Sequence, residues 1–292
     1  MSPTFRERLS DGPPVALDGA TGTNLQARGL ARGQPGETWV LERPEMILQL
    51  HQDFIQAGSE VILTCTFNGG GHFLKPGEVD WITQVDRQAV ALARQAADAA
   101  SGSVFVAGSM GPLGQLLMPF GTLTEEGAFS AYSAHAKALS DAGADLLLIE
   151  TQYDLNEAAI AVRAARSVSD KPVVCTFSFD RGTRSMMGAR PAQVGEQIAP
   201  LGVDAVGINC GRSLAENLQA LQELRAATAL PLWFKPNAGL PRLEDGDRPV
   251  YDLTPEAMGA AVADWLAGGA RLVGGCCGTT PAHLAAIVHA IR

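Results

Sequence analysis

Short apolar runs alternate along the chain with alanine-rich stretches in which apolar positions recur every three to four residues. The short runs predict buried strands, and the longer stretches predict amphipathic helices. In one such stretch, Ile47, Leu50 and Phe54 fall on a single helical face. The pattern predicts eight strands, over residues 15–20, 60–67, 104–109, 145–150, 173–179, 205–209, 232–235 and 271–274.

The order of these elements indicates the fold. Several helical stretches end at a glycine and a short polar step into the next strand, as at Gly58, Gly143 and Gly202. Eight regular strand and helix repeats, with no low-complexity linker, predict a parallel sheet closed into a (β/α)8 TIM barrel. We therefore expect a single α/β domain over residues 1–292. An open doubly wound sheet is the alternative, although it seldom carries eight such units.

Composition narrows the class of protein. The 292 residues are 46% hydrophobic and 18% charged, and the net charge of −9 without a basic run disfavours a nucleic-acid partner. No apolar stretch has the length of a signal peptide at the N-terminus or of a membrane span elsewhere. The five cysteines lack the regular spacing of a secreted disulfide framework. We expect a cytoplasmic protein with reduced thiols and no membrane partner.

A (β/α)8 barrel builds its site from residues at the carboxyl ends of its strands. No histidine stands at such an end, which disfavours a histidine-rich metal site. Three of the five cysteines and two carboxylates do fall there. The strand ends carry Asp18, Thr66 with Phe67 and Asn68, Ser109, Glu150, Ser178, Asn209 with Cys210, Asn237, and Cys276 with Cys277.

The cysteines point to a metal. Cys276 and Cys277 lie in the segment GGCCGTTP (274–281), directly after the last strand and before a helix that Thr280 and Pro281 are expected to open. Neighbouring side chains on a regular strand face opposite ways, so both sulfurs reach one ion only where glycines let the backbone turn. Cys210 ends the sixth strand, and on a closed barrel only the seventh strand separates it from the eighth. Three thiolates with an open fourth position are typical of a reactive zinc site.

Each cysteine also has a simpler explanation. Cys210 alone could be a small buried apolar residue, and the adjacent pair could be a vicinal disulfide or two inert thiols. Cys175 lies in the middle of the fifth strand, and Cys65 lies one residue short of the rim. We expect these last two to contribute to packing.

The carboxylates and Ser109 suggest how a ligand is held. Glu150 ends a strand of four apolar residues, so it must be paired or face a polar cavity. Together with Asp18 it could receive a ligand ammonium group, although Asp18 before Gly19 is also compatible with an Asx turn. The hydroxyl of Ser109, or amides near it, could bind a carboxylate, and an ordinary turn serine is the alternative. The glycine run 69–71 is expected to mark a mobile loop.

A zinc ion with three thiolates carries net negative charge, so it suits an external thiol better than it suits acidifying water. Free thiols have a pKa of about 8.5 and are mostly protonated at neutral pH, whereas coordination to a metal ion removes the proton. The chemistry expected of such a site is S-alkylation of a bound thiol.

Seven motifs resemble the zinc-dependent homocysteine S-methyltransferase family: LDGATGT (17–23), TCTF (64–67), GSMGP (108–112), IET (149–151), INC (208–210), PNAGLP (236–241) and GGCCGTTP (274–281). The resemblance covers about residues 10–292 and is greatest to the homocysteine-binding module of cobalamin-dependent methionine synthase. It implies that Cys210, Cys276 and Cys277 bind Zn²⁺, with homocysteine as fourth ligand, and that Asp18 and Glu150 hold its amino-acid end. It also implies that Asn237, otherwise a turn asparagine, caps the zinc until the thiol displaces it.

The expected function is therefore zinc-dependent methyl transfer to homocysteine, giving methionine. The expected substrate contacts are Asp18, Thr66, Phe67, Ser109, Glu150 and Asn209. Because the chain ends soon after the cysteine motif, the methyl donor is expected to be a small sulfonium or ammonium compound, or to belong to a separate corrinoid or folate protein. Where this chain has Cys65 the family often has asparagine, which leaves the hydrogen bonding on the second strand open.

Two other functions fit the same residues. The barrel could exchange methyl groups between another thiol or thioether and a corrinoid protein. It could also be a non-catalytic zinc- or thiol-binding module of a larger assembly, which would require a fourth protein ligand such as Cys65.

Overall fold

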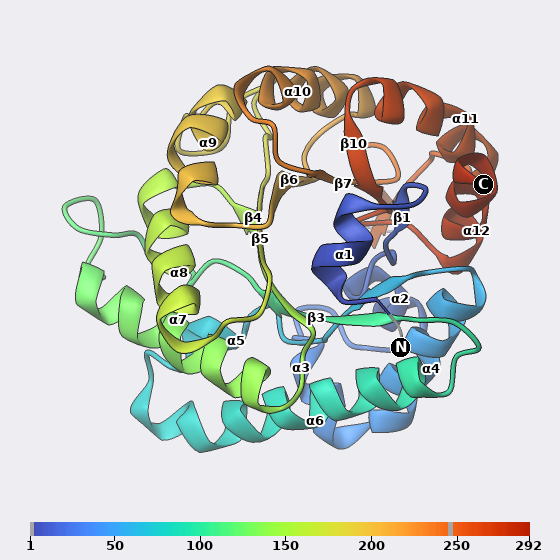
Figure 1. Cartoon of the computed structure of the whole chain (residues 1–292). Helices are drawn as coiled ribbons and strands as arrows, with labels where there is room; N and C mark the ends of the chain where they lie inside the picture. The colour runs from blue at the N-terminus through green and yellow to red at the C-terminus, as the bar shows by residue number, and fades with distance from the viewer. Residues whose placement is uncertain (1–2, 245–247) are drawn as a thin grey trace.

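The computed structural model describes residues 3–244 and 248–292 and confirms the predicted barrel. Eight parallel strands form one sheet in the order β1-β10-β7-β6-β5-β4-β3-β2, with helices arranged around it (Figure 1). A parallel bridge between Leu17 and Val61 joins β1 to β2. The amide of Glu60 also donates to the carbonyl of Ala16 at 2.8 Å. These contacts close the sheet into a (β/α)8 barrel.

The barrel strands coincide with the eight predicted ones but differ at their ends. β2 stops before Thr64 because the Thr66 amide donates to the Thr64 carbonyl at 3.0 Å, which turns the chain away from the ladder. An antiparallel hairpin, β8 (Arg242–Glu244) and β9 (Arg248–Val250), was not predicted. The barrel strands are β1 (Val15–Ala16), β2 (Val61–Leu63), β3 (Phe105–Met110), β4 (Leu146–Gln152), β5 (Val173–Phe177), β6 (Ala205–Cys210), β7 (Leu232–Pro236) and β10 (Ala270–Val273).

Helices precede β1 and connect the strands. The predicted stops at Gly58, Gly143 and Gly202 are confirmed, since all three have positive φ. Among the described residues, no helix combines the length and apolar character needed to cross a bilayer. The helices are α1 (Phe5–Ser10), α2 (Gly22–Ala27), α3 (Glu37–Glu42), α4 (Pro44–Gln56), α5 (Gly69–His72), η1 (Pro76–Glu78), α6 (Val79–Asp98), α7 (Glu125–Asp141), α8 (Leu155–Val168), α9 (Pro191–Gln197), η2 (Ala199–Leu201), α10 (Leu214–Ala227), α11 (Pro255–Ala267) and α12 (Pro281–Ile291).

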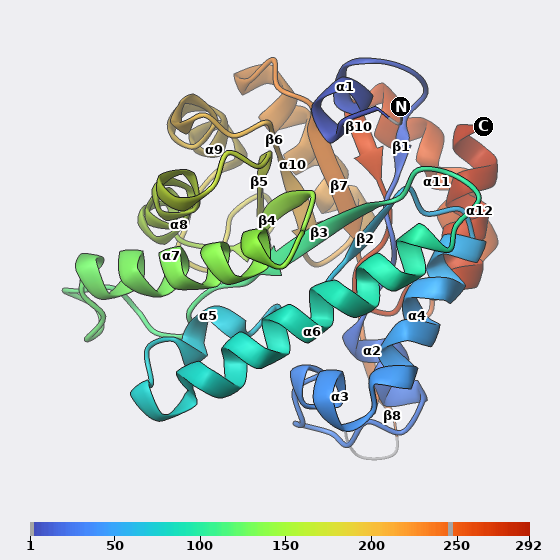
Figure 2. The same ribbon diagram turned by 60° about the horizontal axis from the view of Figure 1, so that its bottom comes forward.

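The strands separate two apolar cores. Alternate side chains point to opposite faces, so Val61 and Leu63 pack inside the barrel while Ile62 packs against the helices. Phe5 and Leu9 of α1 belong to the interior cluster and cover its amino-terminal end. Figure 2 shows α1 at one end of the barrel and α2, α3 and β8 at the other. The carboxyl-terminal mouth, where the site is expected, is therefore the end away from α1.

The glycine run 69–71 is not a loop. It forms α5, a short helix packed against α7, so the expectation of a mobile loop is wrong. A Cβ at Gly69 would lie 2.6 Å from the His135 ring, and one at Gly71 would lie 3.0 Å from the Leu113 carbonyl oxygen. These glycines thus permit close approach between packed elements.

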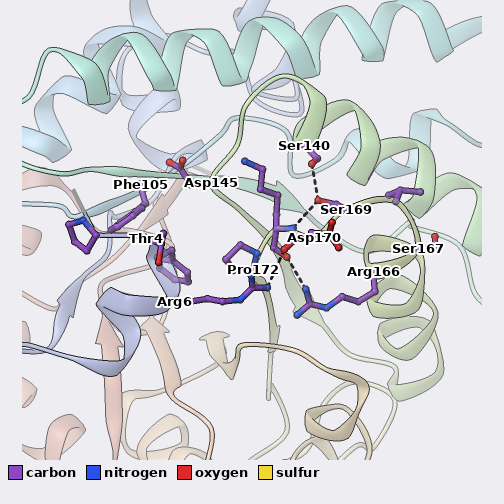
Figure 3. Close-up of a pocket in the computed structure, with 14 residues that line it drawn as sticks. Thr4, Arg6, Phe105, Ser140, Asp145, Arg166, Ser167, Ser169, Asp170 and Pro172 are labelled. Carbon is purple, nitrogen blue, oxygen red and sulfur yellow. Dashed lines mark hydrogen bonds between the residues drawn. The ribbon is translucent and has the colours of Figure 1, made fainter. Parts of the chain in front are cut away.

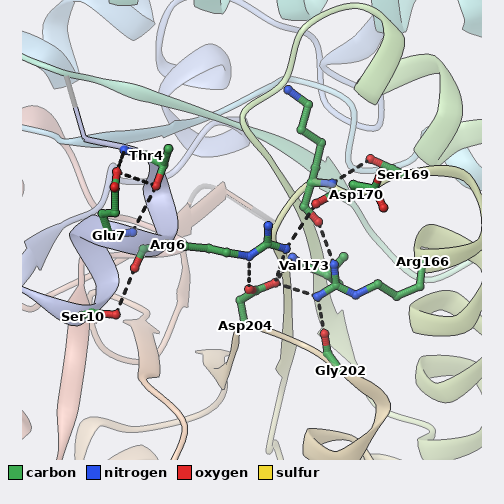
Figure 4. A network of polar contacts seen from close by, with 11 residues as sticks. Thr4, Arg6, Glu7, Ser10, Arg166, Ser169, Asp170, Val173, Gly202 and Asp204 are labelled. Atoms are coloured by element: carbon green, nitrogen blue, oxygen red, sulfur yellow. Dashed lines mark hydrogen bonds and ion pairs between the residues drawn. The ribbon is translucent and has the colours of Figure 1, made fainter. Parts of the chain in front are cut away.

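Asp204 joins α1 to the amino-terminal ends of neighbouring strands (Figure 4). Its carboxylate accepts hydrogen bonds from Arg6 at 2.6 Å, from Arg166 at 2.7 Å and from the Val173 amide at 2.9 Å. Burial alone would raise the pKa of Asp204, but these donors outweigh it and hold the pKa below its usual value. Beside this network lies an open cleft of about 710 Å³, with Asp170 and Pro172 in its lining (Figure 3). Lys171 also lines this cleft.

We expect Asp204→Asn to lower the free energy of unfolding by about 1–3 kcal/mol at neutral pH, because two guanidinium groups lose a charged acceptor. Since the folded-state pKa of Asp204 is depressed, its contribution is present above about pH 4 and is lost as the pH falls further. Thermal unfolding at several pH values checks this. The exposed Asp141→Asn serves as a control. A wild-type advantage over Asp204→Asn that persists unchanged in strong acid would contradict it.

Candidate metal and substrate site

The three predicted cysteines converge at the carboxyl ends of β6 and β10. The Sγ atom of Cys210 lies 3.0 Å from that of Cys276 and 3.9 Å from that of Cys277, although 66 residues separate Cys210 from Cys276. All three sulfurs lie within 4.8 Å of one another. Across residues 3–244 and 248–292, this is the one cluster of three or more histidine, cysteine or carboxylate side chains with metal-binding spacing.

The backbone around Cys210 adopts an uncommon conformation. Cys210 has a φ of 58° and Gly211 a φ of 77°, both in the left-handed region, which a non-glycine residue adopts only when the surroundings enforce it. The Asn217 amide group donates to the Cys210 carbonyl at 2.7 Å, and that of Asn237 donates to the Gly211 carbonyl at 2.8 Å. These bonds hold the turn that directs Sγ of Cys210 toward the cysteines of β10.

The turn after β10 depends on glycine, as predicted. A Cβ at Gly275 would lie 2.4 Å from the Thr279 side chain, and one at Gly278 would lie 2.1 Å from the Tyr251 ring. No larger residue fits either position without displacing its neighbour. The chain then enters α12 through Thr280 and Pro281, as expected from the sequence.

The sulfur cluster fits a soft divalent cation. Contacts with Cys210 and Cys276 hold the pKa of the Cys277 thiol well below its usual value, whereas contacts with Cys276 and Cys277 raise the pKa of the Cys210 thiol well above it. Three thiolates within 4.8 Å of one another repel, so a cation between them favours the ionised form of all three. The amide nitrogen of Asn237 donates to the Gly211 carbonyl, while its buried Oδ1 has no hydrogen-bond partner among the residues that the structure describes. An orphaned oxygen of this kind suits an exchangeable ligand.

A cavity of about 390 Å³ opens in front of the cysteines, a size suited to a small molecule. Of the residues predicted to contact substrate, Phe67, Ser109 and Glu150 line it. Asp18, Thr66 and Asn209 do not contribute to its lining; all three are buried. The walls also include residues that the sequence did not single out, among them Glu37, Thr151 and Lys235.

Glu150 is buried, yet its carboxylate faces the cavity. Its Oε1 accepts the Ser109 hydroxyl at 2.5 Å, and the amide of Asn209 lies 3.4 Å from Oε2. Burial raises the pKa of Glu150 to about 7; Lys235 opposes the rise, while Cys276 and Asp18 add to it. At neutral pH the carboxyl group is therefore close to the midpoint of its titration.

Asn209 and Thr66 are engaged by the protein itself. Oδ1 of Asn209 accepts from the Thr151 amide at 2.8 Å and from the Thr176 hydroxyl at 2.6 Å, and its Nδ2 donates to the Thr151 hydroxyl at 2.7 Å. The Thr66 hydroxyl donates to the Ser109 carbonyl at 2.7 Å. Both side chains thus connect neighbouring strands beneath the cavity.

Lys235 is a site residue that the sequence analysis missed. It comes from β7, is buried, and donates from Nζ to Oδ1 of Asp18 at 2.5 Å. Oδ2 of Asp18 accepts the Leu63 amide at 2.8 Å. Burial alone would lower the pKa of Lys235, but Asp18 and Glu150 raise it above its usual value. A lysine directly after Leu-Trp-Phe in a buried strand was a signal, because such a charge needs a partner.

No comparable feature of the sequence marks Tyr251 or Glu37 as a site residue. The Tyr251 side chain, which follows β9, hydrogen-bonds the Cys277 thiol, and its ring packs against Gly278. Glu37 begins α3, lines the cavity and accepts the Asn68 amide at 2.7 Å. Both lie in connecting segments whose position relative to the strands cannot be inferred from periodicity.

We expect Tyr251→Phe to weaken the binding of a soft divalent cation to the sulfur cluster roughly tenfold, because a hydrogen bond to a thiol that would hold the metal contributes to metal affinity on that scale. Competition with a zinc chelator measures the change. Tyr153→Phe, at a half-buried tyrosine near the same end of the barrel, provides a control. Equal affinity in wild type and Tyr251→Phe would show that this contact does not support the metal site.

The remaining cysteines lie outside the sulfur cluster. Cys175 is fully buried in β5, and burial raises the pKa of its thiol. Cys65 is also buried, although its residue contributes to the cavity wall, and burial and Glu37 raise its pKa. Neither thiol is placed as a fourth ligand.

Known proteins resemble this chain in sequence and in structure. The family model for homocysteine S-methyltransferase matches residues 15–291. Methionine synthase from Mycobacterium tuberculosis is 33% identical over 290 residues, which cover 94% of this chain but 24% of that protein. The chain thus spans about a quarter of the length of this relative. Crystal structures of the Escherichia coli homocysteine methyltransferase MmuM share 29% identity; the metallated form has a TM-score of 0.81 over 97% of this chain and 98% of that one.

Proposed function

This chain belongs to the homocysteine S-methyltransferase family, and we propose that it methylates the thiol of homocysteine at a zinc ion held by Cys210, Cys276 and Cys277. The observation that carries the proposal is the convergence of three sulfurs from the ends of two strands on the wall of a cavity. A solved relative with this fold is described as a homocysteine methyltransferase and exists in a metallated form. We propose that residues 1–292 form the homocysteine-binding barrel and that it works in the cytoplasm.

Zinc in this site would keep the homocysteine sulfur as a thiolate at neutral pH, where a free thiol is mostly protonated. The chain itself positions the reactants. The left-handed turn at Cys210 and the glycine turn around Cys276 and Cys277 preorganise the three sulfurs. Because the cysteines lie on the cavity wall, a fourth ligand reaches them from that side.

The amino-acid end of homocysteine is proposed to bind deeper in the cavity. Glu150 accepts the ammonium group, with its carboxylate oriented by the Ser109 hydroxyl. Phe67 forms part of the wall beside it. Thr66 and Asn209 act from behind the wall by holding the strands in register.

The site gives little support to a purely structural zinc module. A structural site is saturated by four protein ligands. Here the sulfur cluster has three members, and no fourth histidine, cysteine or carboxylate joins it in the described part of the chain. The buried Oδ1 of Asn237 is the remaining candidate, and an amide oxygen is readily displaced by a thiol.

The apolar residues exposed at the mouth of the barrel help to identify the class of methyl donor. The segment between β3 and α7 exposes Leu116, Met118 and Phe120, and the segment between β5 and α9 exposes Met186 and Met187. Exposed apolar residues on the loops around a site favour docking of another protein or domain. We therefore propose two donor classes: a methyl group delivered by a separate corrinoid or folate protein, or a small sulfonium or ammonium compound that enters alone.

A donor panel tests the function and separates these classes. The zinc-loaded protein is offered homocysteine with S-methylmethionine, betaine, adenosylmethionine, methylcobalamin or methyltetrahydrofolate in parallel, and methionine is measured. Methionine with any one donor supports the proposed reaction and identifies the donor class. Failure with every donor, while zinc and homocysteine still bind, would favour the alternative of a module that binds the thiol without transferring a methyl group.

A further inference from the structure

Lys235 is the only positively charged side chain among the described residues that line the cavity. The cavity also carries Glu37, Glu150 and the three cysteines. An amino acid has one ammonium and one carboxylate, so a site for it supplies an acceptor for the first and N–H or O–H donors for the second, among which a charged donor binds most strongly. Glu150 is the acceptor in the proposed function, and Lys235 is the charged donor that the cavity offers.

Ser109, the partner expected for the carboxylate, has no donor to spare. Its hydroxyl donates to Glu150 at 2.5 Å, and its amide donates to the Thr64 hydroxyl at 3.0 Å. Each of these groups has a single proton, so neither can also donate to a ligand without releasing its partner. The carboxylate therefore needs another donor.

Lys235 has such donors. An ammonium group carries three N–H bonds, and one of them is directed to Asp18 Oδ1. Asp18 is fixed in turn by the Leu63 amide. Asp18 thus holds the Lys235 side chain in place and neutralises its charge while the cavity is empty. In the described part of the chain no hydrogen bond takes up the other two N–H bonds, which remain for a ligand. The side chain loses little freedom on binding, because it is already ordered by Asp18.

Resting on the proposed function, we propose that Lys235 binds the carboxylate of the thiol substrate, while Asp18 acts as its positioning residue rather than as a contact for the substrate ammonium. The substrate class follows from this arrangement. It is a thiol that carries both an ammonium, for Glu150, and a carboxylate, for Lys235. Thiols lacking the carboxylate should bind poorly although their sulfur can still reach the metal.

Three thiols test the assignment on the zinc-loaded protein: homocysteine, 3-aminopropane-1-thiol, which lacks the carboxylate, and 4-sulfanylbutanoate, which lacks the ammonium. Calorimetry gives the dissociation constants. We expect wild type to bind homocysteine roughly 10- to 150-fold more tightly than 3-aminopropane-1-thiol, the range of one charge-assisted hydrogen bond. Equal affinity for these two thiols in wild type would overturn the proposal without any variant.

The double variant removes the cation without leaving an unpaired buried charge. Lys235→Met combined with Asp18→Asn keeps the net charge of the cavity unchanged, and Lys235→Gln keeps a neutral donor for Asp18 should the double variant not fold. In either, the preference for homocysteine over 3-aminopropane-1-thiol should shrink to about threefold or less, while the preference over 4-sulfanylbutanoate persists. Lys171→Met, on the opposite face, is the matched control.

The outcomes separate this inference from the function on which it rests. An unchanged preference for homocysteine over 3-aminopropane-1-thiol in a folded, zinc-containing Lys235 variant shows that the carboxylate is held elsewhere. Absence of homocysteine binding to zinc-loaded wild type overturns the proposed function and this inference with it. Tight binding of 4-sulfanylbutanoate to wild type contradicts the role of Glu150 but leaves that of Lys235 supported.

Discussion

Cys276→Ala is expected to abolish zinc retention and methyl transfer together. Cys276 contacts Cys210 at 3.0 Å in the sulfur cluster, so its loss leaves two thiols on the cavity wall. Removing a direct ligand should weaken zinc binding by more than the roughly 10–100-fold that loss of an outer contact costs. Zinc content after dialysis and methionine formation, measured on the same preparation, check the prediction.

The control for this variant is Cys175→Ala, which makes the same substitution at a fully buried cysteine outside the cluster. It is expected to keep its zinc and its activity, with some loss of stability from the missing sulfur. A Cys276→Ala protein that is free of metal but still forms methionine would remove zinc from the mechanism. One that retains zinc in full would place the metal elsewhere.

Glu150→Gln is expected to weaken homocysteine binding roughly 30- to 150-fold at neutral pH, which corresponds to about 2–3 kcal/mol for a charged hydrogen bond in a buried site. Glutamine keeps the shape of the side chain and can still accept the Ser109 hydroxyl, so the change isolates the charge. Titration calorimetry measures it. Glu157→Gln, at a buried glutamate that accepts the Leu113 amide outside the cavity, is the matched control.

The titration of Glu150 predicts that homocysteine binding depends on pH. The pKa of Glu150 is about 7, raised by burial, and only the ionised carboxylate pairs with an ammonium. The affinity of wild type for homocysteine should therefore fall about tenfold for each pH unit below the pKa of Glu150. This fall adds to the pH dependence that release of the thiol proton imposes on wild type and on Glu150→Gln alike. Glu150→Gln should lose this additional slope. Parallel slopes for the two proteins would show that the ammonium does not pair with Glu150.

The sequence predicted the barrel and the sulfur cluster because both depend on local patterns combined with one topological rule. Eight strands could be counted from apolar runs, and Cys210, Cys276 and Cys277 each stand at a strand end. In a closed barrel, strand ends meet at one face whatever their separation in sequence. The convergence of residues 66 positions apart was therefore predictable without coordinates.

The other site residues could not be predicted, because their roles depend on which side chains contact each other across the barrel. The periodicity of apolar residues along the chain does not contain that information. Lys235 and Asp18 pair over 217 residues, from strands that are not neighbours in the sheet. Tyr251 reaches Cys277 from the segment after a hairpin that apolar patterning did not reveal. The run 69–71 suggested mobility because glycine is flexible in isolation, whereas close packing against His135 and Leu113 is what requires glycine there.

The most direct test of the account is the zinc X-ray absorption spectrum of the protein with and without homocysteine. We expect three sulfur ligands and one lighter oxygen or nitrogen ligand in the free protein, and four sulfur ligands after homocysteine is added. That exchange would show a metal held by three cysteines with one position left for the substrate thiol. A spectrum that stays the same on addition of homocysteine, or that shows four sulfurs from the start, would contradict the account.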